Sequence, residues 1–278
     1  MSPTLSLIVA VYNKPDVLRL LTAALARQTL RDAEVIFADD GSGEAVAQVV
    51  AEAREALPFS VQHLWHEDLG WRKNTMLNAA VRMARSDYLV FIDADCLPHA
   101  RFLEDHMRAR APRTVLCGRR VEMSRRWSEN LSIERVESGA FERLSAGVWL
   151  DGLRGHAVRV EDGLRLPAPL GRLLHGGKGA MLGSNFSIHK NDLASINGFD
   201  EMYDGPGCGE DSDIEFRLRL AGVRVQSLRH SAIQYHIWHP RTVPAERCLH
   251  RFTTVQRERR MRCVHGLEHL TVFDEAAA

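Results

Sequence analysis

Two aspartates separated by a single residue give the sharpest chemical signal in this sequence. Asp93-Ala94-Asp95 directly follows the apolar run at residues 88–92, which is typical of a buried strand. Hard cations such as Mg²⁺ and Mn²⁺ prefer oxygen ligands and often bind through one or two carboxylates together with substrate phosphates. A short acidic pair can also cap a loop, but its place at a strand end favours a metal-binding role.

Further polar groups follow the other expected strands. Tyr12 and Asn13 follow the first strand, Asp39 and Asp40 the second, and Glu67 and Asp68 the third. Open parallel sheets bind ligands beyond the carboxyl ends of their strands, so we expect these groups to share one edge with the aspartate pair. Carboxylates crowded there repel each other unless a cation binds between them. The sequence therefore predicts a divalent metal at this edge.

A second acidic signal follows the glycine-rich segment Gly-Pro-Gly-Cys-Gly at residues 205–209. Such a segment lets backbone and carboxylate groups approach a ligand closely. Glu210 and Asp211, which come directly after it, are therefore candidate functional residues. Asp213 and Glu215 are explained more simply as acids that complement the dipole of the helix starting here.

Two histidines, His236 and His239, lie at and just beyond the end of a β-like run at residues 226–236. A histidine is more often structural than a metal ligand, and this chain has thirteen of them. Their spacing alone therefore leaves both interpretations open.

The elements that must position these groups alternate along the first hundred residues. Apolar runs without helical period, typical of strands, lie at residues 5–11, 34–38, 61–66 and 88–92. Apolar residues at helical spacing follow Pro15 and recur at 44–56 and 73–84. This order predicts an α/β fold of Rossmann-like type, with a mostly parallel central sheet flanked by helices.

The second half of the chain is less regular. Residues 152–179 are rich in glycine and predict a mobile loop. Helical period returns at 211–221, with Gly222 as the C-terminal cap, and a strand at 226–236 and a basic helix at 244–264 complete the expected elements.

Composition excludes some classes of protein. The 278 residues contain 45% hydrophobic and 26% charged residues, and 36 basic side chains balance 36 acidic ones, so the charge does not indicate a nucleic-acid partner. The five cysteines include no CxxC pair, which argues against a disulfide framework and a zinc cage. The apolar start lacks the features of a signal peptide, and no apolar run reaches membrane-spanning length. We therefore expect a cytoplasmic protein.

Taken together, these motifs resemble the family 2 glycosyltransferases of the GT-A fold, and in particular their galactosyltransferase-like branch. The resemblance covers residues 5 to about 239. It rests on the segments Val9-Ala10-Val11-Tyr12-Asn13, Asp39-Asp40-Gly41-Ser42, Asp93-Ala94-Asp95, Gly183-Ser184-Asn185, Asn197-Gly198-Phe199-Asp200-Glu201 and Glu210-Asp211. It implies a single GT-A domain at 1–240, with a nucleotide-sugar half at 1–100 and an acceptor half at 101–240. Residues 241–278 would form a C-terminal helical extension.

The resemblance also implies roles for individual residues. The nucleotide would bind the backbone near Ala10, with Tyr12, Asp40, Lys73, Asp93 and Ala94, and the donor sugar would lie beside Gly183 and Ser184. Asp95, with Asp93, would bind the metal, and His236 would be a further ligand, with His239 as second choice. Asp211 would be the catalytic base, and Glu210 would bind sugar hydroxyls.

The implied reaction is an inverting, Mn²⁺- or Mg²⁺-dependent transfer. A hexose or N-acetylhexosamine would move from a UDP-sugar to a glycan or lipid-linked acceptor hydroxyl. A sugar nucleotidyltransferase and a non-catalytic nucleotide-sugar-binding module are the alternatives. The absence of GxGxxG after the first strand argues against a dinucleotide-dependent oxidoreductase. An aspartyl-phosphate phosphatase would carry its motif after the first strand rather than the fourth.

Two features leave the acceptor open. Related enzymes often carry an aromatic residue where this chain has Cys208, so Trp71, Trp149 or Trp238 would have to stack on an acceptor sugar. The basic tail offers a contact to an anionic membrane at the inner face of the cell membrane, although a solvated helix face explains it as well. Its arginines are Arg247, Arg251, Arg257, Arg259, Arg260 and Arg262.

Overall fold

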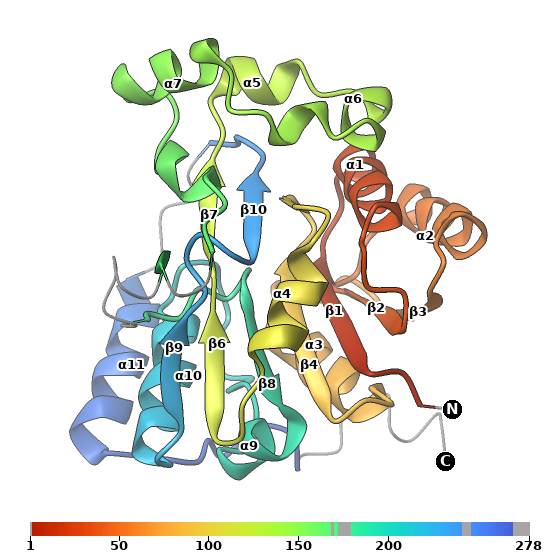
Figure 1. Ribbon diagram of the computed structural model, residues 1–278. Coiled ribbons are helices and arrows are strands. Elements are labelled where there is room, and N and C mark those ends of the chain that lie inside the picture. Colours follow the sequence, from red (N-terminus) through yellow and green to blue (C-terminus); the bar gives the residue numbers. More distant parts are fainter. Residues whose placement is uncertain (1, 168–169, 172–178, 241–245, 269–278) are drawn as a thin grey trace.

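A seven-stranded sheet of order β3-β2-β1-β4-β8-β6-β9 forms the centre of the molecule (Figure 1). We describe residues 2–167, 170–171, 179–240 and 246–268 of a computed structural model. The strands are β1 (Leu5–Val11), β2 (Ala33–Asp39), β3 (Ser60–Trp65), β4 (Tyr88–Asp93), β6 (Thr114–Cys117), β8 (Phe186–His189) and β9 (Arg224–Ser227). Only β8 runs antiparallel to its neighbours, which confirms the mostly parallel sheet expected from the sequence.

Helices cover both faces of this sheet. They are α1 (Pro15–Ala26), α2 (Glu44–Ala56), α3 (Lys73–Met83), α4 (Phe102–Ala109), α9 (Lys190–Ser195) and α10 (Glu210–Leu220). Alternation along β1 places Leu7 and Val9 in the core with α1 and α2, and Ile8 in the core with α3 and α10. The continuous apolar run of β1 is therefore a consequence of burial on both faces.

A second sheet has three strands, β5 (Cys96–Pro98), β10 (Ile233–His236) and β7 (Arg119–Glu122), in the order β5-β10-β7. The prediction of a single strand at residues 226–236 is wrong. This segment forms two strands, β9 and β10, which belong to different sheets. A turn separates them, in which the Ser231 amide donates to the Leu228 carbonyl and His230 has a positive φ of 64°. Leu97, Val121 and Tyr235 pack one face of the small sheet into the core.

Short helices lie above the sheets in Figure 1. They are α5 (Arg125–Glu129), α6 (Ile133–Glu137) and α7 (Ala146–Leu153), with the 3₁₀ turns η1 (Ala140–Glu142) and η2 (Val160–Gly163). Serines 124, 132 and 145 cap α5, α6 and α7, each accepting a backbone N–H from the first turn. The predicted loop at 152–179 is partly ordered by η2, where Arg229 pairs with Asp162. Its residues 168–169 and 172–178 lie outside the described part.

The C-terminal helix α11 (Glu246–Glu258) is shorter than the sequence predicted. It stops before Arg259, whose positive φ of 49° breaks the helical path. Three arginines of the basic tail are engaged within the molecule: Arg251 with Asp200, Arg260 with Glu258 and Arg262 with Glu268. Fewer of these charges therefore remain for an anionic membrane. No helix in the described residues is long and apolar enough to span a bilayer.

The state of the cysteines only partly matches the expectation that the chain has no disulfide framework. Cys96, Cys117 and Cys263 are buried and free. Cys208 is disulfide-bonded, which the sequence argument against a disulfide framework does not predict.

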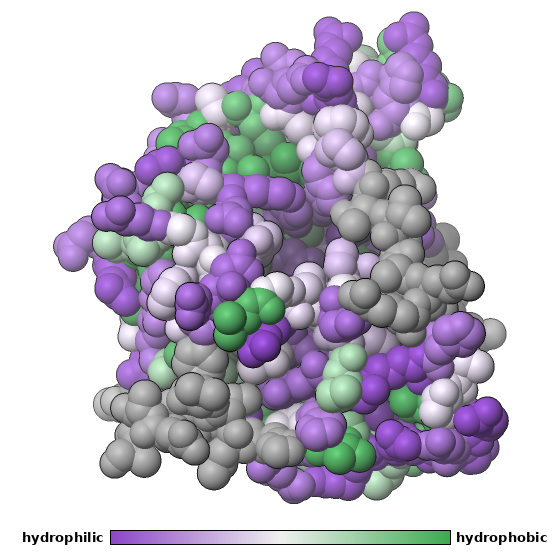
Figure 2. All heavy atoms as spheres, turned by 180° about the vertical axis from the view of Figure 1, so that it is seen from behind, coloured by the Kyte–Doolittle hydropathy of each residue, from purple (hydrophilic) through white to green (hydrophobic). Residues whose placement is uncertain are grey.

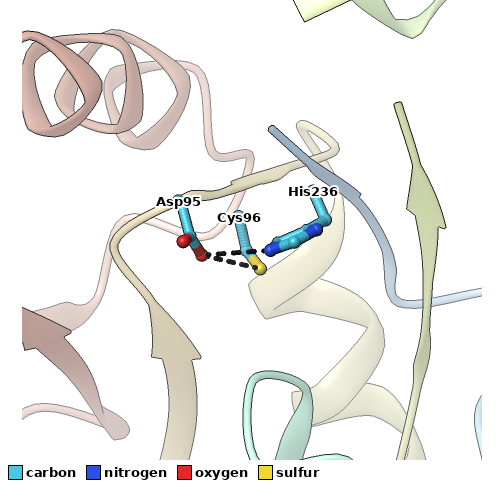
Figure 3. A group of neighbouring side chains, drawn as sticks. All are labelled: Asp95, Cys96 and His236. Carbon is cyan, nitrogen blue, oxygen red and sulfur yellow. Dashed lines mark hydrogen bonds and ion pairs between the residues drawn. The ribbon is translucent and has the colours of Figure 1, made fainter. Parts of the chain in front are cut away.

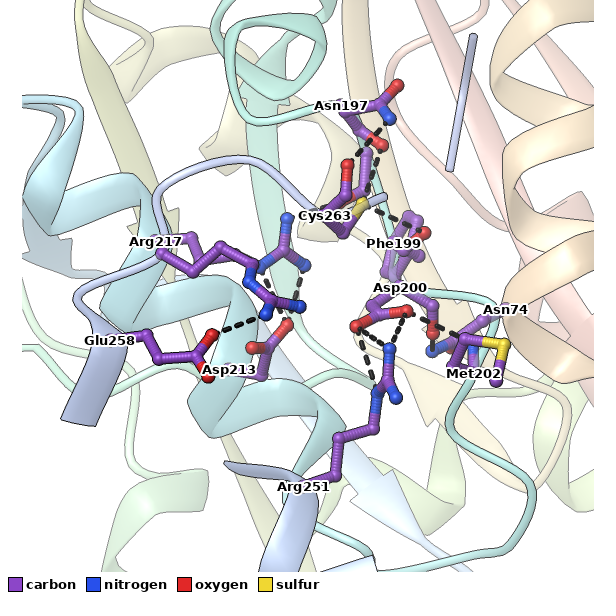
Figure 4. A network of polar contacts seen from close by, with 12 residues as sticks. Asn74, Asn197, Phe199, Asp200, Met202, Asp213, Arg217, Arg251, Glu258 and Cys263 are labelled. Carbon is purple, nitrogen blue, oxygen red and sulfur yellow. Dashed lines mark hydrogen bonds and ion pairs between the residues drawn. The ribbon is translucent and has the colours of Figure 1, made fainter. Parts of the chain in front are cut away.

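A buried ion pair within α10 holds Arg217, which in turn connects the helix to the segment before it (Figure 4). Arg217 Nη2 lies 2.6 Å from Asp213 Oδ2, and each side chain is only 1% exposed. Arg217 also donates from Nη1 to the carbonyls of Ile196 and Gly198, both at 2.9 Å. Asp213 is thus structural, as expected, but it serves as the partner of a buried arginine rather than as a helix-dipole acid.

Replacement of Arg217 is expected to destabilise the fold. Arg217→Met leaves the Asp213 carboxylate buried without its partner, which lowers the free energy of unfolding by about 3–5 kcal/mol. Urea unfolding measures this change. Arg219→Met removes a half-exposed pair with Glu215 on the same helix and is expected to cost less than about 1 kcal/mol. Equal effects of the two substitutions would contradict the structural role of Arg217.

Candidate active site

The aspartate pair lies at the carboxyl end of β4, the central strand of the seven-stranded sheet, between parallel β1 and antiparallel β8. The Ala94 amide donates to the Ala10 carbonyl at 3.0 Å, and the Asp40 amide donates to the Val11 carbonyl at 2.9 Å. These bonds tie the turns after β1, β2 and β4 together. The predicted convergence of the strand ends is therefore confirmed.

Asp93 forms an ion pair with Lys73, the first residue of α3. The Lys73 Nζ lies 2.6 Å from Asp93 Oδ1. Burial opposes ionisation of Asp93, but the charge and hydrogen bond of Lys73, together with the Arg120 charge and His236, hold the pKa of Asp93 below its usual value. Burial likewise opposes the charge on Lys73, and Asp93, Asp211 and Glu210 together raise the pKa of Lys73. A fixed positive charge thus lies among three acidic side chains.

Asp95 is surrounded by groups from distant parts of the chain. The Nε2 atoms of His236 and His239 each lie 3.6 Å from one of its two oxygens. Lys14 Nζ lies 3.5 Å from Oδ2. The structure therefore brings both candidate histidines to Asp95. Lys14 was missed, because a lysine in a turn carries no sequence signal for this contact.

The small sheet presents a row of side chains to this site. Register places Cys96 on β5 and Glu122 on β7 directly beside His236 on β10. Glu122 Oε2 lies 2.7 Å from His236 Nδ1, which leaves Nε2 toward Asp95. Burial opposes the charge on Glu122, but the His236 hydrogen bond and the Arg120 charge lower the pKa of Glu122 to about 2. A carboxylate that orients an imidazole in this way is common behind metal-ligating histidines.

A second group of polar side chains surrounds the Ser184 hydroxyl. Arg120 and Gln234 both donate to the Ser184 hydroxyl, at 3.4 and 3.0 Å. The Gln234 Oε1 atom is buried and has no hydrogen-bond partner within the described ranges. Sequence reasoning missed Cys96, Glu122, Arg120 and Gln234, because only the long-range pairing of β10 with β5 and β7 aligns them.

Asp211 lies in the first turn of α10 and faces the loop that carries Gly183. Its Oδ2 accepts the Gly183 backbone N–H at 2.8 Å. A Cβ atom at residue 183 would come within 2.1 Å of Asp211 Oδ1, so a larger residue here would displace the Asp211 carboxylate. Burial raises the pKa of Asp211 and of neighbouring Glu210 above their usual values, as befits candidate bases.

The expected nucleotide side of the site is built around Asp40. Asp40 Oδ1 lies 2.9 Å from His66 Nε2, and Asp40 Oδ2 accepts the backbone N–H of Arg72 at 2.8 Å. Burial raises the pKa of Asp40. Tyr12 is half exposed, and its hydroxyl donates to Asp68 at 3.0 Å. Gly41, with φ of 92°, allows Asp68 to approach closely. These residues thus form a pre-built turn beside the aspartate pair.

The surroundings of Cys208 distinguish among the three tryptophan candidates. Cys208 is buried with Tyr203, and Trp71 packs against both. Trp238 stacks on Arg125, 5.3 Å from its guanidinium carbon, and Trp149 packs against the larger core. Trp71 therefore lies beside the place where related enzymes carry an aromatic residue.

The back of the molecule, in Figure 2, is largely hydrophilic and hollowed near its middle.

Comparison with known proteins decides the family. A family description, Glycosyl transferase family 2, matches residues 6–150, more than half of the chain. The chain belongs to glycosyl transferase family 2. A second description, N-terminal domain of galactosyltransferase, matches residues 177–240 of this glycosyltransferase.

Curated relatives are similar over most of the glycosyltransferase. Validoxylamine A glucosyltransferase of Streptomyces hygroscopicus subsp. jinggangensis (strain 5008) is 28% identical over 238 residues, which cover 82% of this chain and 54% of the relative. Chondroitin synthase of Escherichia coli is 27% identical over 250 residues, covering 84% of this chain and 34% of the relative. The glycosyltransferase thus spans about half or less of the length of these relatives.

Solved structures show that the fold is GT-A. Staphylococcus aureus TarS 1–349 in complex with UDP has a TM-score of 0.60 at 17% identity and covers 97% of this chain and 68% of its own. The mannosyltransferase PcManGT from Pyrobaculum calidifontis, in complex with GDP-Man and Mn²⁺, has a TM-score of 0.57 at 17% identity, with coverage of 87% and 59%. At this identity the likeness is one of fold.

Substitution of Gly183 is expected to impair the glycosyltransferase. In Gly183→Ala the new methyl group collides with Asp211 and displaces its carboxylate. Because Asp211 is the candidate base, a shift of about 1 Å is expected to cost about 100-fold in kcat. Steady-state kinetics with thermal unfolding as a folding check measures the loss. Gly147→Ala on α7, where a Cβ meets only an ordinary contact of 3.7 Å, serves as the matched control. A Gly183→Ala enzyme with unchanged kcat would show that Asp211 need not lie where it does.

Proposed function

We propose that this glycosyltransferase moves a hexose or N-acetylhexosamine from a UDP-sugar to a hydroxyl of a glycan or lipid-linked acceptor, with inversion at the anomeric carbon. The observation that carries the proposal is the arrangement of Asp93, Asp211 and Glu210 around Lys73, at the strand ends where a parallel sheet binds its ligand. Structures of similar fold contain UDP and UDP-GlcNAc.

The residues around Asp95 fit a divalent metal. The Nε2 atoms of His236 and His239 each lie 3.6 Å from an oxygen of the Asp95 carboxylate. Glu122 orients His236 through a hydrogen bond to its other ring nitrogen, Nδ1. We propose Asp95 and His236 as ligands together with Asp93, and His239 as the second choice for the histidine. When bound, Mn²⁺ or Mg²⁺ supplies positive charge that stabilises the departing diphosphate.

Asp211 is the proposed general base. It removes the proton from the acceptor hydroxyl as the oxygen attacks the anomeric carbon from the face opposite the nucleotide. The Gly183 N–H fixes one carboxylate oxygen, so the other is left for the acceptor. Glu210, next to it, binds sugar hydroxyls. A single displacement of this kind converts an α-linked donor into a β-linked product.

The donor would lie across the first half of the site. We propose that Asp40, the backbone near Ala10 and Tyr12 hold the uracil, that Asp93 and Ala94 hold the ribose, and that Lys73 lies beside the nucleotide. Gly183 and Ser184 would border the donor sugar, with Ser184 held in place by Arg120 and Gln234.

We propose the same division of the chain as for related enzymes: residues 1–100 for the nucleotide sugar, 101–240 for the acceptor and 241–278 as a C-terminal extension. Trp71, beside Cys208, is the proposed stacking surface for an acceptor sugar. A lipid-linked acceptor would add peripheral contact with a membrane surface.

The base gives the reaction an expected pH dependence. Only the ionised form of Asp211 accepts a proton, and burial raises its pKa above the ordinary 3.8. As the pH falls through this raised pKa, Asp211 becomes protonated and kcat/KM declines. The acid limb of the pH profile is therefore expected above pH 3.8, and the residual activity of Asp211→Asn should lack it. An acid limb shared by both proteins would assign it to another group.

Proton NMR of donor hydrolysis tests the stereochemical proposal without a known acceptor. With water as acceptor and an α-linked UDP-sugar, the β-anomer of the free sugar should appear first and mutarotate afterwards. Initial release of the α-anomer would exclude a single displacement on Asp211.

A further inference from the structure

One side chain at the metal site is of a different chemical kind from its neighbours. Cys96 directly follows Asp95, is buried, and carries a free thiol. It lies on β5 opposite His236 on β10, and directly opposite residues of an antiparallel pair present their side chains on the same face. Figure 3 shows Asp95, Cys96 and His236 pointing toward one another.

The distances suit a small ion. Cys96 Sγ lies 3.7 Å, and His236 Nε2 3.6 Å, from the same Asp95 oxygen. One ligand atom from each residue lies within 4.8 Å of the other two, and this is the one such group of three found in the described part of the chain. Bonds of about 2.0–2.3 Å to a tetrahedral Zn²⁺ place neighbouring ligand atoms about 3.3–3.8 Å apart.

We propose that Asp95, Cys96 and His236 together form a binding site for a thiophilic divalent ion such as Zn²⁺, which competes with the Mn²⁺ or Mg²⁺ of the transfer reaction. The inference deepens the proposed metal site and rests on that part of the proposed function. Thiolate ligands select Zn²⁺ over Mn²⁺ and Mg²⁺, which bind through oxygen. On binding, the Cys96 thiol releases its proton to solvent as the metal–sulfur bond forms.

The arrangement needs little reorganisation to bind the ion. Glu122 already holds His236 Nδ1 at 2.7 Å, so Nε2 is oriented before any ion arrives. The backbone pairing of His236 with Cys96 fixes the relative position of imidazole and sulfur. Zn²⁺ therefore binds without the donor. It inhibits transfer because it occupies Asp95 and His236 together with the Cys96 sulfur, which Mn²⁺ does not require as a ligand.

Cobalt spectroscopy tests the sulfur ligand without any turnover. The full chain, free of affinity tag and donor, is titrated with Co²⁺. The wild type should show intense near-ultraviolet absorption from sulfur-to-cobalt charge transfer, which Zn²⁺ displaces. Cys96→Ser should lose this absorption and bind Zn²⁺ about 100-fold more weakly, while its Mn²⁺ affinity changes by less than about threefold. Cys117→Ser, which removes another buried free thiol, should keep the absorption.

Two results would overturn the proposal. One is Co²⁺ binding to the wild type without sulfur charge transfer, and the other is retention of the charge transfer in Cys96→Ser. Should Cys96→Ser fail to fold, X-ray absorption at the zinc edge of the wild type decides the matter, since one sulfur neighbour supports the proposal and none contradicts it. A protein that shows the sulfur signal but releases no UDP would contradict the proposed transfer reaction and leave this inference standing.

Discussion

Asp211→Asn is expected to lower the rate of sugar transfer by about 100- to 10,000-fold, the range that a positioned general base contributes. The asparagine is close to the aspartate in size and can still accept the Gly183 N–H that holds the native side chain at 2.8 Å. It cannot take a proton from the acceptor. Donor affinity should therefore change little, because the substitution removes an interaction made only in the transition state.

Glu215→Gln provides the matched control for this substitution. Glu215 lies one turn further along α10, and its carboxylate also accepts a backbone N–H from the same loop, that of Met181. Its effect on kcat should stay below about tenfold, since it supplies no proton acceptor to the reaction. If Asp211→Asn retained near-native kcat, or if Glu215→Gln were equally damaging, the assignment of the base would be wrong.

Asp95→Ala is expected to abolish metal-dependent donor binding. Both candidate histidines lie 3.6 Å from the Asp95 carboxylate, so its removal takes away the anion on which the proposed metal site is centred. Loss of metal stabilisation, worth several kcal/mol, should lower kcat/KM by about 1,000-fold or more. Calorimetric titration of UDP in the presence and absence of Mn²⁺ measures the binding part of this effect.

Histidine variants sharpen the same experiment. His236→Ala should weaken Mn²⁺-dependent UDP binding more than His239→Ala, because His236 is buried and oriented by Glu122 whereas His239 is about one third exposed. The reverse order would make His239 the ligand. Metal-enhanced UDP binding that persists in Asp95→Ala would place the metal elsewhere in the site.

The fold of the N-terminal half, proposed to bind the nucleotide, could be predicted from local sequence. Leu5–Val11 and Glu44–Ala56 are the observed bounds of β1 and α2, because period and burial on both faces leave a clear local pattern. The placement of Asp40 and Asp93 then follows from parallel strand pairing. Sequence order thus determines which groups reach the edge of the sheet.

The remaining part of the site depends on contacts between distant segments. Nothing near Glu122 or Arg120 in the sequence indicates that β7 pairs with β10, and the turn at His230 divides what read as one strand. Cys96 likewise carries no local signal for this site, because only its register with His236 brings it there. The buried pair of Arg217 and Asp213 was equally invisible, because an acid in a first helical turn has a simpler local explanation.

The measurement that tests the central claim most directly is nucleotide release from a panel of UDP-, GDP-, dTDP- and ADP-sugars, with and without Mn²⁺. The account predicts Mn²⁺-dependent release of UDP from one or a few UDP-sugars, no comparable release from the other nucleotides, and loss of the activity in Asp95→Ala. Release that is indifferent to Mn²⁺, or confined to a nucleotide other than UDP, would contradict it.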